Sequence, residues 1–452
     1  KVYYEHEKPL SEIPDEPEKE PGIPDEPGKN PGYSDEEIEE LIEKGYIPIA
    51  TAEELNNARN TITETYGKGT KWENKYEGGL DKKYIQVANV DLSGYSEGKG
   101  WVPIGDENSK FTGSFNGNGY KITRLTIDRP DTNYIGLFGY IQEATIENVA
   151  LEDVNIKGKE YTGGLVGEAD NSSIKDSYAT GEVSGKNYTG GLVGYAYDST
   201  IISNSYATGP VTNTGVWTGG LVGRAYRSSI SNSYATGTVS GGTGNDTGGL
   251  VGEADNSSIK DSYATGEVTG SDWTGGLVGG ANNSTTISNS YATGEVTGSG
   301  WIGGLVGGAD SSTTISNSYA TGTVSGTGNN TGGLVGKAKD STIKDSYARG
   351  TVTSTGYWTG GLVGYAGTST ITNSYATGPV NDTGGLVGGA YSSSITKSYW
   401  DTETTGQTKS AGGEGKTTDD LKKQITYDGW DFENTWEIEE GQSYPTLKNI
   451  AN

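Results

Sequence analysis

A recurring column of mostly aromatic residues is the clearest candidate for binding chemistry in this sequence. A position that accepts both Trp and Asp is expected at the protein surface. A partly aromatic stripe there could stack on sugar rings or on another subunit, and the alternative is that the rings shield a corner of the fold. The column precedes a repeated Thr-Gly-Gly and reads Tyr161, Tyr188, Trp217, Asp246, Trp273, Trp301, Asn330, Trp358 and Asp382, so its six aromatic members are candidate ligand or subunit contacts.

The sequence offers little for catalysis. His6 is the only histidine, so the chain cannot build a Ser-His-Asp set or a histidine metal cluster. Two carboxylates could serve a glycosidase. However, residues such as Asp176 and Glu182 lie in short, nearly identical repeats and are better explained as ladder or surface groups. We therefore expect that the chain is not an enzyme, with a polysaccharide-active enzyme as the less favoured alternative.

Acidic turns are the other possible ligand site. The turn from Glu168 to Asn171 could offer oxygen ligands to calcium. The acidic residues do not recur at one position, because later copies replace Glu168 with Tyr195, Arg224 and Gly280. We expect no cofactor, and bound calcium is the weakly supported alternative.

Several Asn-x-Ser/Thr sequons fall in predicted turns. They would accept N-glycans in an organism with that machinery, although such matches also arise by chance in turns rich in Ser, Thr and Asn. The candidate asparagines are Asn171, Asn187, Asn245, Asn256, Asn282, Asn283, Asn329 and Asn381.

These residues are positioned by a repeat with a period of 27 to 29 residues, which shortens to 24 for the last copy. Such a period is typical of a solenoid, and a disordered chain would not keep its apolar residues in register. One marker is the leucine of a Gly-Leu-Val-Gly core, at Leu165, Leu192, Leu221, Leu250, Leu277, Leu305, Leu334, Leu362 and Leu386. The second is a Ser-Tyr pair, at Tyr178, Tyr206, Tyr234, Tyr263, Tyr291, Tyr319, Tyr347, Tyr375 and Tyr399.

Each copy is cut into short β-prone runs by turn residues, which predicts an all-β fold, a parallel β-solenoid of about ten rungs of ~28 residues. Within the first complete copy we expect strands at 164–166, 174–180 and 182–184. Like residues should stack in ladders, as Leu165, Ile174 and Val183 with their equivalents. The glycine pair Gly163-Gly164 is expected to mark a corner, through positive φ or close backbone approach.

The direction of the repeat tyrosine is open. Strict alternation from Ile174 places Tyr178 on the inner face, and we favour this inward stack. The small residues Ser177 and Ala179, which recur in nearly every copy, argue for the reverse, with a bulge after Ile174 and the tyrosines stacked outside.

Regions outside the repeat are expected to serve as an arm and as caps. Residues 1–33 form a Pro/Glu-rich arm in which Val2, Tyr3 and Tyr4 could add as a strand to an exposed sheet edge of another subunit. Residues 34–133 are predicted as an N-terminal cap with two short helices, headed by capping residues Ser34 and Thr51. The repeats occupy 134–399, and 400–452 are predicted as a C-terminal cap.

Composition limits the partners. The net charge of −26 argues against nucleic-acid binding and against anionic lipid. No apolar run approaches the ~20 residues of a membrane span. The chain begins at Lys1 and contains no Cys or Met, which we interpret as a secreted, processed product.

The motifs Gly163-Gly164-Leu165-Val166-Gly167 and Ser177-Tyr178-Ala179-Thr180-Gly181, with the tail from Tyr399 to Pro445, resemble the GLUG-repeat family of bacterial and archaeal surface proteins. The resemblance implies an extracellular β-solenoid, commonly part of an adhesin or large surface protein. Some immunoglobulin-A-cleaving metallopeptidases also carry the repeat, but their His-Glu-x-x-His motif is absent here. Relatives often carry Cys where this chain has Ser before the repeat tyrosine.

We therefore expect a secreted structural protein of the cell surface. It would be a rigid rod that self-assembles through its N-terminal arm into a filament, or that forms an adhesin stalk. The alternative is a monomeric carbohydrate-binding adhesin module that uses the aromatic column on surface glycans.

Overall fold

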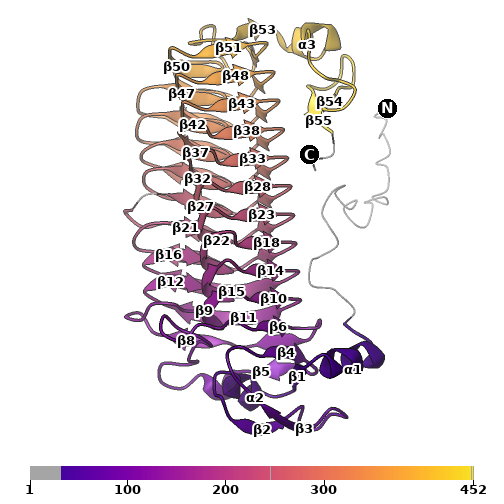
Figure 1. The fold of residues 1–452 in the computed structure, drawn as a ribbon. Helices are drawn as coiled ribbons and strands as arrows, with labels where there is room; N and C mark the ends of the chain where they lie inside the picture. The colour runs from indigo at the N-terminus through magenta and orange to yellow at the C-terminus, as the bar shows by residue number, and fades with distance from the viewer. Residues whose placement is uncertain (1–31, 245, 449, 451–452) are drawn as a thin grey trace, which may run out of the picture.

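The computed structural model describes residues 32–244, 246–448 and 450. Its body is one parallel β-solenoid, in which successive turns of chain stack along a single axis (Figure 1). The predicted fold class is confirmed. Val2, Tyr3, Tyr4, His6 and Asn245 lie outside the described residues.

One turn shows the plan of all the complete ones. Its strands are β16 (Asn187–Gly190), β17 (Val193–Tyr197), β18 (Ile201–Ser203), β19 (Tyr206–Ala207) and β20 (Val211–Asn213). Each strand pairs in parallel with its equivalent in the next turn. The result is a ten-stranded valine sheet from β9 (Phe138–Gln142) to β50 (Val387–Tyr391), and a thirteen-stranded isoleucine sheet from β1 (Tyr46–Ile49) to β51 (Ser394–Thr396).

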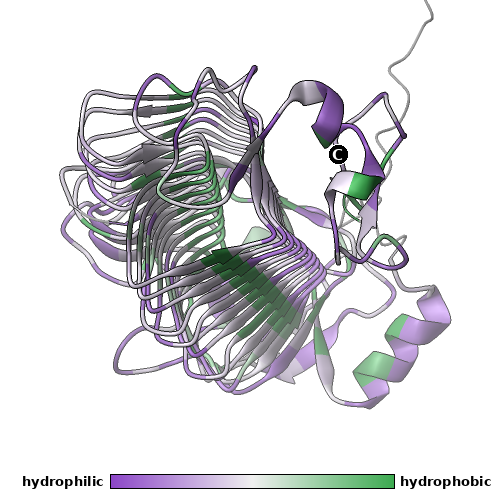
Figure 2. Cartoon of the chain, turned by 90° about the horizontal axis from the view of Figure 1, so that it is seen from above, coloured by the Kyte–Doolittle hydropathy of each residue, from purple (hydrophilic) through white to green (hydrophobic). Residues whose placement is uncertain are grey.

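The predicted ladders are confirmed. Ile174 pairs with Ile202, Val183 pairs with Val211, and the Leu165 amide donates to the Leu192 carbonyl at 2.9 Å. The Leu, Ile and Val columns are buried in the core, except at Ile395 of the last turn, which is half-buried. Viewed along the axis, residues of like hydropathy form continuous stripes (Figure 2).

The predicted strand boundaries at the leucine need correction. Leu165 lies at a corner between β12 (Glu160–Gly163) and β13 (Val166–Asp170), not in the middle of a strand. The strand predicted at 174–180 is also divided, and its residues belong to β14 (Ser173–Lys175) and β15 (Tyr178–Gly185).

Close backbone approach, rather than positive φ, explains the glycine pair. A methyl group added at Gly164 would lie 2.4 Å from the carbonyl oxygen of Gly191 in the next turn and 2.9 Å from the Cβ of Ala179. These glycines have ordinary φ values. The left-handed corners are occupied instead by other residues, such as Asp176 with φ of 49°.

The favoured inward tyrosine stack is wrong. Asp176 takes up the left-handed conformation, which breaks the alternation of the strand, so that Ser177 and Ala179 face the core and Tyr178 faces out. The tyrosines stack outside the core, and the rings of Tyr178 and Tyr206 are parallel with centroids 4.7 Å apart. Asn and Asp tolerate left-handed backbone better than most residues, which explains their recurrence at this corner.

The serine column ties the turns together from inside. The backbone amide of Ser177 donates to Ser205 Oγ at 3.3 Å, and Ser205 Oγ donates to the carbonyl of Ser203 at 2.8 Å. The same pair of bonds recurs as far as Ser374 and Ser398. Each buried hydroxyl thus satisfies a corner amide that the strands leave unpaired.

The parallel ladder begins upstream of the sequence repeat. In the isoleucine sheet, β1 pairs with β4 (Lys83–Gln86), β4 with β6 (Ser114–Asn116), and β6 with β10 (Thr145–Glu147). The end of the rod is covered by α2 (Ala52–Asn57) and the hairpin of β2 (Thr63–Tyr66) and β3 (Asn74–Glu77), and α1 (Asp35–Glu43) lies beside the first strands (Figure 1). Helix α1 carries the predicted capping box, in which the Glu37 amide donates to Ser34 Oγ at 3.3 Å.

At the other end, the column of Ala179 and its equivalents ends at Trp400 of β52 (Tyr399–Asp401), which pairs with Ala376. The Trp400 indole covers the end of the core beside Gly385. Strand β53 (Glu414–Lys416) pairs with β52. The following segment, with α3 (Thr418–Leu421), β54 (Trp436–Glu437) and β55 (Thr446–Leu447), does not lie across the end. It lies beside the rod against the outer tyrosines (Figures 1 and 2).

Candidate functional site

The aromatic column lies at a left-handed corner of the solenoid. Tyr161, Trp217 and Trp358 have φ values of 54°, 61° and 60°, and so do Asp246 and Asn330, at 65° and 64°. Asn and Asp favour this backbone region, whereas an aromatic residue needs packing to offset its cost. The mixture of Trp, Tyr, Asp and Asn therefore reflects a backbone requirement, and the expected surface position is wrong for Asn330, which is buried.

In the first part of the column, the rings cover one another. The centroids of Tyr134 and Tyr161 are 4.9 Å apart, those of Tyr161 and Tyr188 are 4.6 Å apart, and those of Tyr188 and Trp217 are 4.4 Å apart. The Arg224 guanidinium lies 4.9 Å from the Trp217 ring centre. Faces that stack on a neighbouring ring or on a cation are not free to stack on a sugar.

A second block repeats this arrangement. Trp273 and Trp301 have ring centres 4.6 Å apart, and Lys337 Nζ lies 3.6 Å from the centre of Trp301. Trp273 also lies against the backbone of Gly308 in the next turn, where a methyl group would meet its ring at 2.7 Å.

The column becomes accessible at its last aromatic member. Trp358 is 43% exposed and Tyr357 beside it is 75% exposed, while the next position of the column is Asp382. Tyr365 lies 5.1 Å from Trp358, between ring centres. Trp358 packs over Gly389 of β50, and Tyr391, two residues further along the same face, is 68% exposed. We call Tyr357, Trp358, Tyr365 and Tyr391 the aromatic patch.

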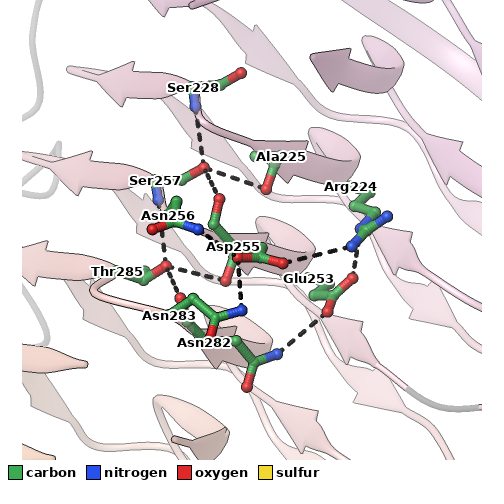
Figure 3. Close-up of polar contacts among 11 residues, drawn as sticks. Arg224, Ala225, Ser228, Glu253, Asp255, Asn256, Ser257, Asn282, Asn283 and Thr285 are labelled. Carbon is green, nitrogen blue, oxygen red and sulfur yellow. Dashed lines mark hydrogen bonds and ion pairs between the residues drawn. The ribbon is translucent and has the colours of Figure 1, made fainter. Parts of the chain in front are cut away.

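A charged cluster interrupts the column between its first two blocks. Arg224 Nε lies 2.5 Å from Glu253 Oε2, although the pair is poorly aligned for a hydrogen bond, and Nη2 lies 3.7 Å from Asp255 Oδ2. Asn282 and Asn283 of the next turn donate to Glu253 and Asp255 at 3.2 and 3.0 Å (Figure 3). The carboxylates are thus held by a guanidinium and by amides of this chain.

Two carboxyl groups have raised pKa values, Asp246 beside this cluster and Glu168 two turns before Arg224. Burial, with a further contribution from the charge of Glu253, raises the pKa of Asp246 to about 8. Burial likewise raises the pKa of Glu168 to about 7. Burial disfavours the ionised form of each carboxyl because the charge loses its hydration.

The acidic residues considered for catalysis or calcium belong to separate ladders. Asp176 accepts a hydrogen bond from Asn204 Nδ2 at 2.9 Å, and Glu182 is exposed. In the turn that starts at Glu168, Asp170 accepts from Gln142 Nε2 at 2.7 Å. Among the described residues, no three His, Cys, Asp or Glu side chains lie close enough to share a metal ion.

The sequons lie on the outer turns. Asn171, Asn256, Asn283, Asn329 and Asn381 are exposed, whereas Asn187 and Asn282 are half-buried. Asn381 is engaged by Ser354, whose amide donates to its Oδ1 at 3.0 Å. Glycosylation stays a prediction.

Seven segments of the chain match the model of the GLUG motif, and its repeats are GLUG repeats. The matches cover residues 158–184, 185–214, 218–240, 243–269, 298–325, 327–353 and 356–381. The copies at 270–297 and 382–399 fall outside these matches but continue the same ladders.

Two relatives share part of the sequence. "Putative Gly-rich membrane protein" of Evansella cellulosilytica is 36% identical over 137 residues, which are 28% of this chain and 14% of the relative. Halomucin of Haloquadratum walsbyi is 34% identical over 113 residues, which are 23% of this chain and 1% of halomucin. The chain therefore matches only a small fraction of either protein's length.

Two solved structures align with most of this chain at low TM-scores. One is a "putative immunoglobulin A1 protease" from Bacteroides ovatus, with TM-score 0.38 and 15% identity over 89% of this chain and 92% of the other. The second is titled "IgA1 Protease", with TM-score 0.32 and 16% identity over 86% of this chain and 28% of the other. None of the helices in the described part of the chain is long and apolar enough to cross a membrane.

Proposed function

We propose that this GLUG-repeat protein is an extracellular structural rod of the cell surface, which assembles end to end into a filament or serves as an adhesin stalk. The observation that carries the proposal is the uninterrupted isoleucine sheet, in which thirteen parallel strands follow one axis from β1 to β51. Each turn is held to the next by backbone pairing, by the buried Leu, Ile and Val ladders and by the serine bonds. A body with this repeated contact resists bending and sets a fixed distance between its ends.

The surface location is supported by the two relatives, one named as a membrane protein and one as a halomucin. The proposal assigns no reaction and no cofactor to the chain. Short, regular turns, a lone histidine outside the described residues, and carboxylates engaged by this chain's own side chains agree with a structural role.

Imaging tests the proposal. Negatively stained protein should show straight rods, and a rise in concentration should lengthen them by end-to-end joining. Antibody labelling of intact source cells should place the protein on the outside. The proposal would be refuted if the purified rods stayed single at every concentration and if the antibody labelled the cells only after lysis.

A second function is glycan binding at the aromatic patch. The observation that favours it is that the accessible ring surface gathers around Trp358, while the other blocks of the column are covered by rings and cations. Aromatic rings with a free face stack on the apolar face of a sugar. Binding to a glycan array should fall when Trp358→Ala is introduced and persist in Trp273→Ala. Equal binding by both variants and the parent protein would exclude the patch.

A further inference from the structure

The two ends of the rod are closed to different degrees. At the N-terminal end, the edge strand β1 contains Pro48, which has no amide to donate, and Ile47 and Ile49 of the same strand are buried. Helix α1 packs against β1, and Gly67 of the adjoining turn lies against the Pro48 ring. Proline and a covering element are the usual protection of a sheet edge.

At the C-terminal end, β50 and β51 are the last strands of the valine and isoleucine sheets. Of these two strands, the loop of residues 409–413 hydrogen-bonds only to the beginning of β50, and its Gly412 lies against part of the Ile395 side chain of β51. At β50 the Ala411 amide donates to the Val387 carbonyl at 2.9 Å, and Ser410 Oγ accepts from the Val387 amide at 2.9 Å. Within the described residues, no strand pairs with the outer side of β50 or β51.

Side-chain exposure confirms that this edge is open. Ala390 is exposed, although its equivalents Ala366 and Ala338 in the two preceding turns are fully buried. Ile395 is only half-buried, whereas Ile371, one turn earlier, is fully buried. One more strand laid along this edge would cover the same core positions that each turn covers for its neighbour.

The closed end of a second rod cannot supply that strand from its first turn. The arm can, because 31 residues precede the first described residue, and the run Val2-Tyr3-Tyr4 near their start has high β-propensity. The arm leaves the rod at its N-terminal end, where the Tyr33 amide donates to Asn118 Oδ1 at 2.6 Å.

Geometry favours the arm of a neighbour over the chain's own arm. From β6, next to Asn118, to β51 the isoleucine sheet takes ten steps, a span of about 48 Å at ~4.8 Å per step. The arm of a coaxial neighbour starts close to the open edge and needs no such extension. The exposed Lys397 and Lys409 beside the edge also complement Glu5 and Glu7, which follow the apolar run.

We propose that the open edge of β50 and β51 accepts the Val2–Tyr4 strand of a second copy by β-strand addition. This inference rests on the end-to-end assembly of the proposed function and names the surfaces that would join. Main-chain hydrogen bonds would supply the affinity, and burial of the Ala390 and Ile395 positions would add to it.

Cysteine pairing tests the contact directly, because the full sequence contains no cysteine. Tyr3→Cys protein is mixed with Ala390→Cys protein, and the disulfide-linked peptides are identified by mass spectrometry. A disulfide that joins position 3 of one chain to position 390 of the other is expected, because a disulfide forms only when the Cα atoms come within about 7 Å. Thr370→Cys, also exposed but one turn earlier on the isoleucine sheet, should not link.

Charge at the edge gives an independent test. Ala390→Glu should leave the isolated rod folded, as judged by circular dichroism, because the site is exposed. It should raise the concentration needed for assembly at least about tenfold, since strand addition would bury the new carboxylate. Thr370→Glu is the matched control and should assemble like the parent protein.

The outcomes separate the inference from the proposed function. Filaments that form equally well with Ala390→Glu would overturn the edge contact and leave the rod assembly standing. A disulfide that joins position 390 of two chains, or a link only within one chain of the Tyr3→Cys/Ala390→Cys double variant, would overturn the second-copy arm. A parent protein that never assembles would overturn both.

Discussion

The Arg349 guanidinium donates from Nη2 to the phenol oxygen of Tyr375 at 2.6 Å, and this phenol donates to the Pro445 carbonyl at 2.5 Å. Arg349 Nη2 also donates to the same carbonyl at 2.9 Å. Arg349 thereby fastens the C-terminal segment to the outer tyrosines. Other copies have threonine at this position, as at Thr321 and Thr377.

Arg349→Thr should therefore release the C-terminal segment. We expect rapid proteolysis within 417–448 and a loss of about 1.5–3 kcal/mol of unfolding free energy, the size of a buried hydrogen bond to a charged group. Limited digestion followed by mass spectrometry would locate the cuts. Arg227→Thr removes an exposed arginine and should change neither result. If Arg349→Thr digests like the parent protein, the other contacts of the segment, such as the hydrogen bonds of Trp430 to Lys397 and of Tyr444 to Asp401, are enough to hold it.

Ser205→Ala should destabilise the rod although it removes a single hydroxyl. The Ser177 amide would lose its buried acceptor, which costs about 1–3 kcal/mol. Urea unfolding followed by circular dichroism would measure the change in midpoint. Ser240→Ala, at an exposed position of the neighbouring turn, is the control and should have almost no effect. Equal midpoints for the two variants would show that the hydroxyl bonds add no net stability.

Asp246→Asn should stabilise the protein at alkaline pH. Because the folded-state pKa of Asp246 is raised to about 8, folding disfavours its ionised form. Stability from this group is present below its ordinary pKa of about 3.9 and is lost as pH rises towards 8. The urea midpoint of the variant should exceed that of the parent protein at pH 9, and the difference should shrink at pH 4. Asp272→Asn, which replaces an exposed carboxylate, should not show this trend.

Removal of divalent cations should leave the rod unchanged. The carboxylates of the turn at Asp170 and of the Arg224 cluster already have hydrogen-bond or ion-pair partners within the chain. Melting temperatures with EDTA and with added calcium should therefore agree. A calcium-dependent rise in melting temperature would show that a turn of the repeat binds the ion.

Recurrence in the sequence was enough to predict the ladders. A residue that returns every 28 positions must meet its own equivalent if the turns stack, so the spacing alone placed Leu165, Ile174 and Val183 correctly. The same reasoning failed for Tyr178, because it assumed an unbroken strand after Ile174. The recurring Asn or Asp at position 176 was the available signal, since these residues favour left-handed corners.

The position of the C-terminal segment could not be predicted from the recurrence of residues in the sequence. Its contacts join residues such as Arg349 and Pro445, which are 96 positions apart, and no periodicity relates them. A single departure from the repeat, Arg in place of Thr, was the only trace in the sequence. Coverage of the aromatic faces was likewise hidden, because it depends on which residue lies in the next turn, as Lys337 lies over Trp301.

The constant register of the leucine corner has a consequence for how such proteins vary. Leu165 hydrogen-bonds to Leu192 in the same register as Leu334 to Leu362, so the chain can lose or gain a whole copy without disturbing the pairing of the remaining turns. Each copy adds one increment of about 4.8 Å. The number of copies therefore sets the length of the rod, and a genetic duplication or deletion of copies changes this length while leaving both ends unchanged.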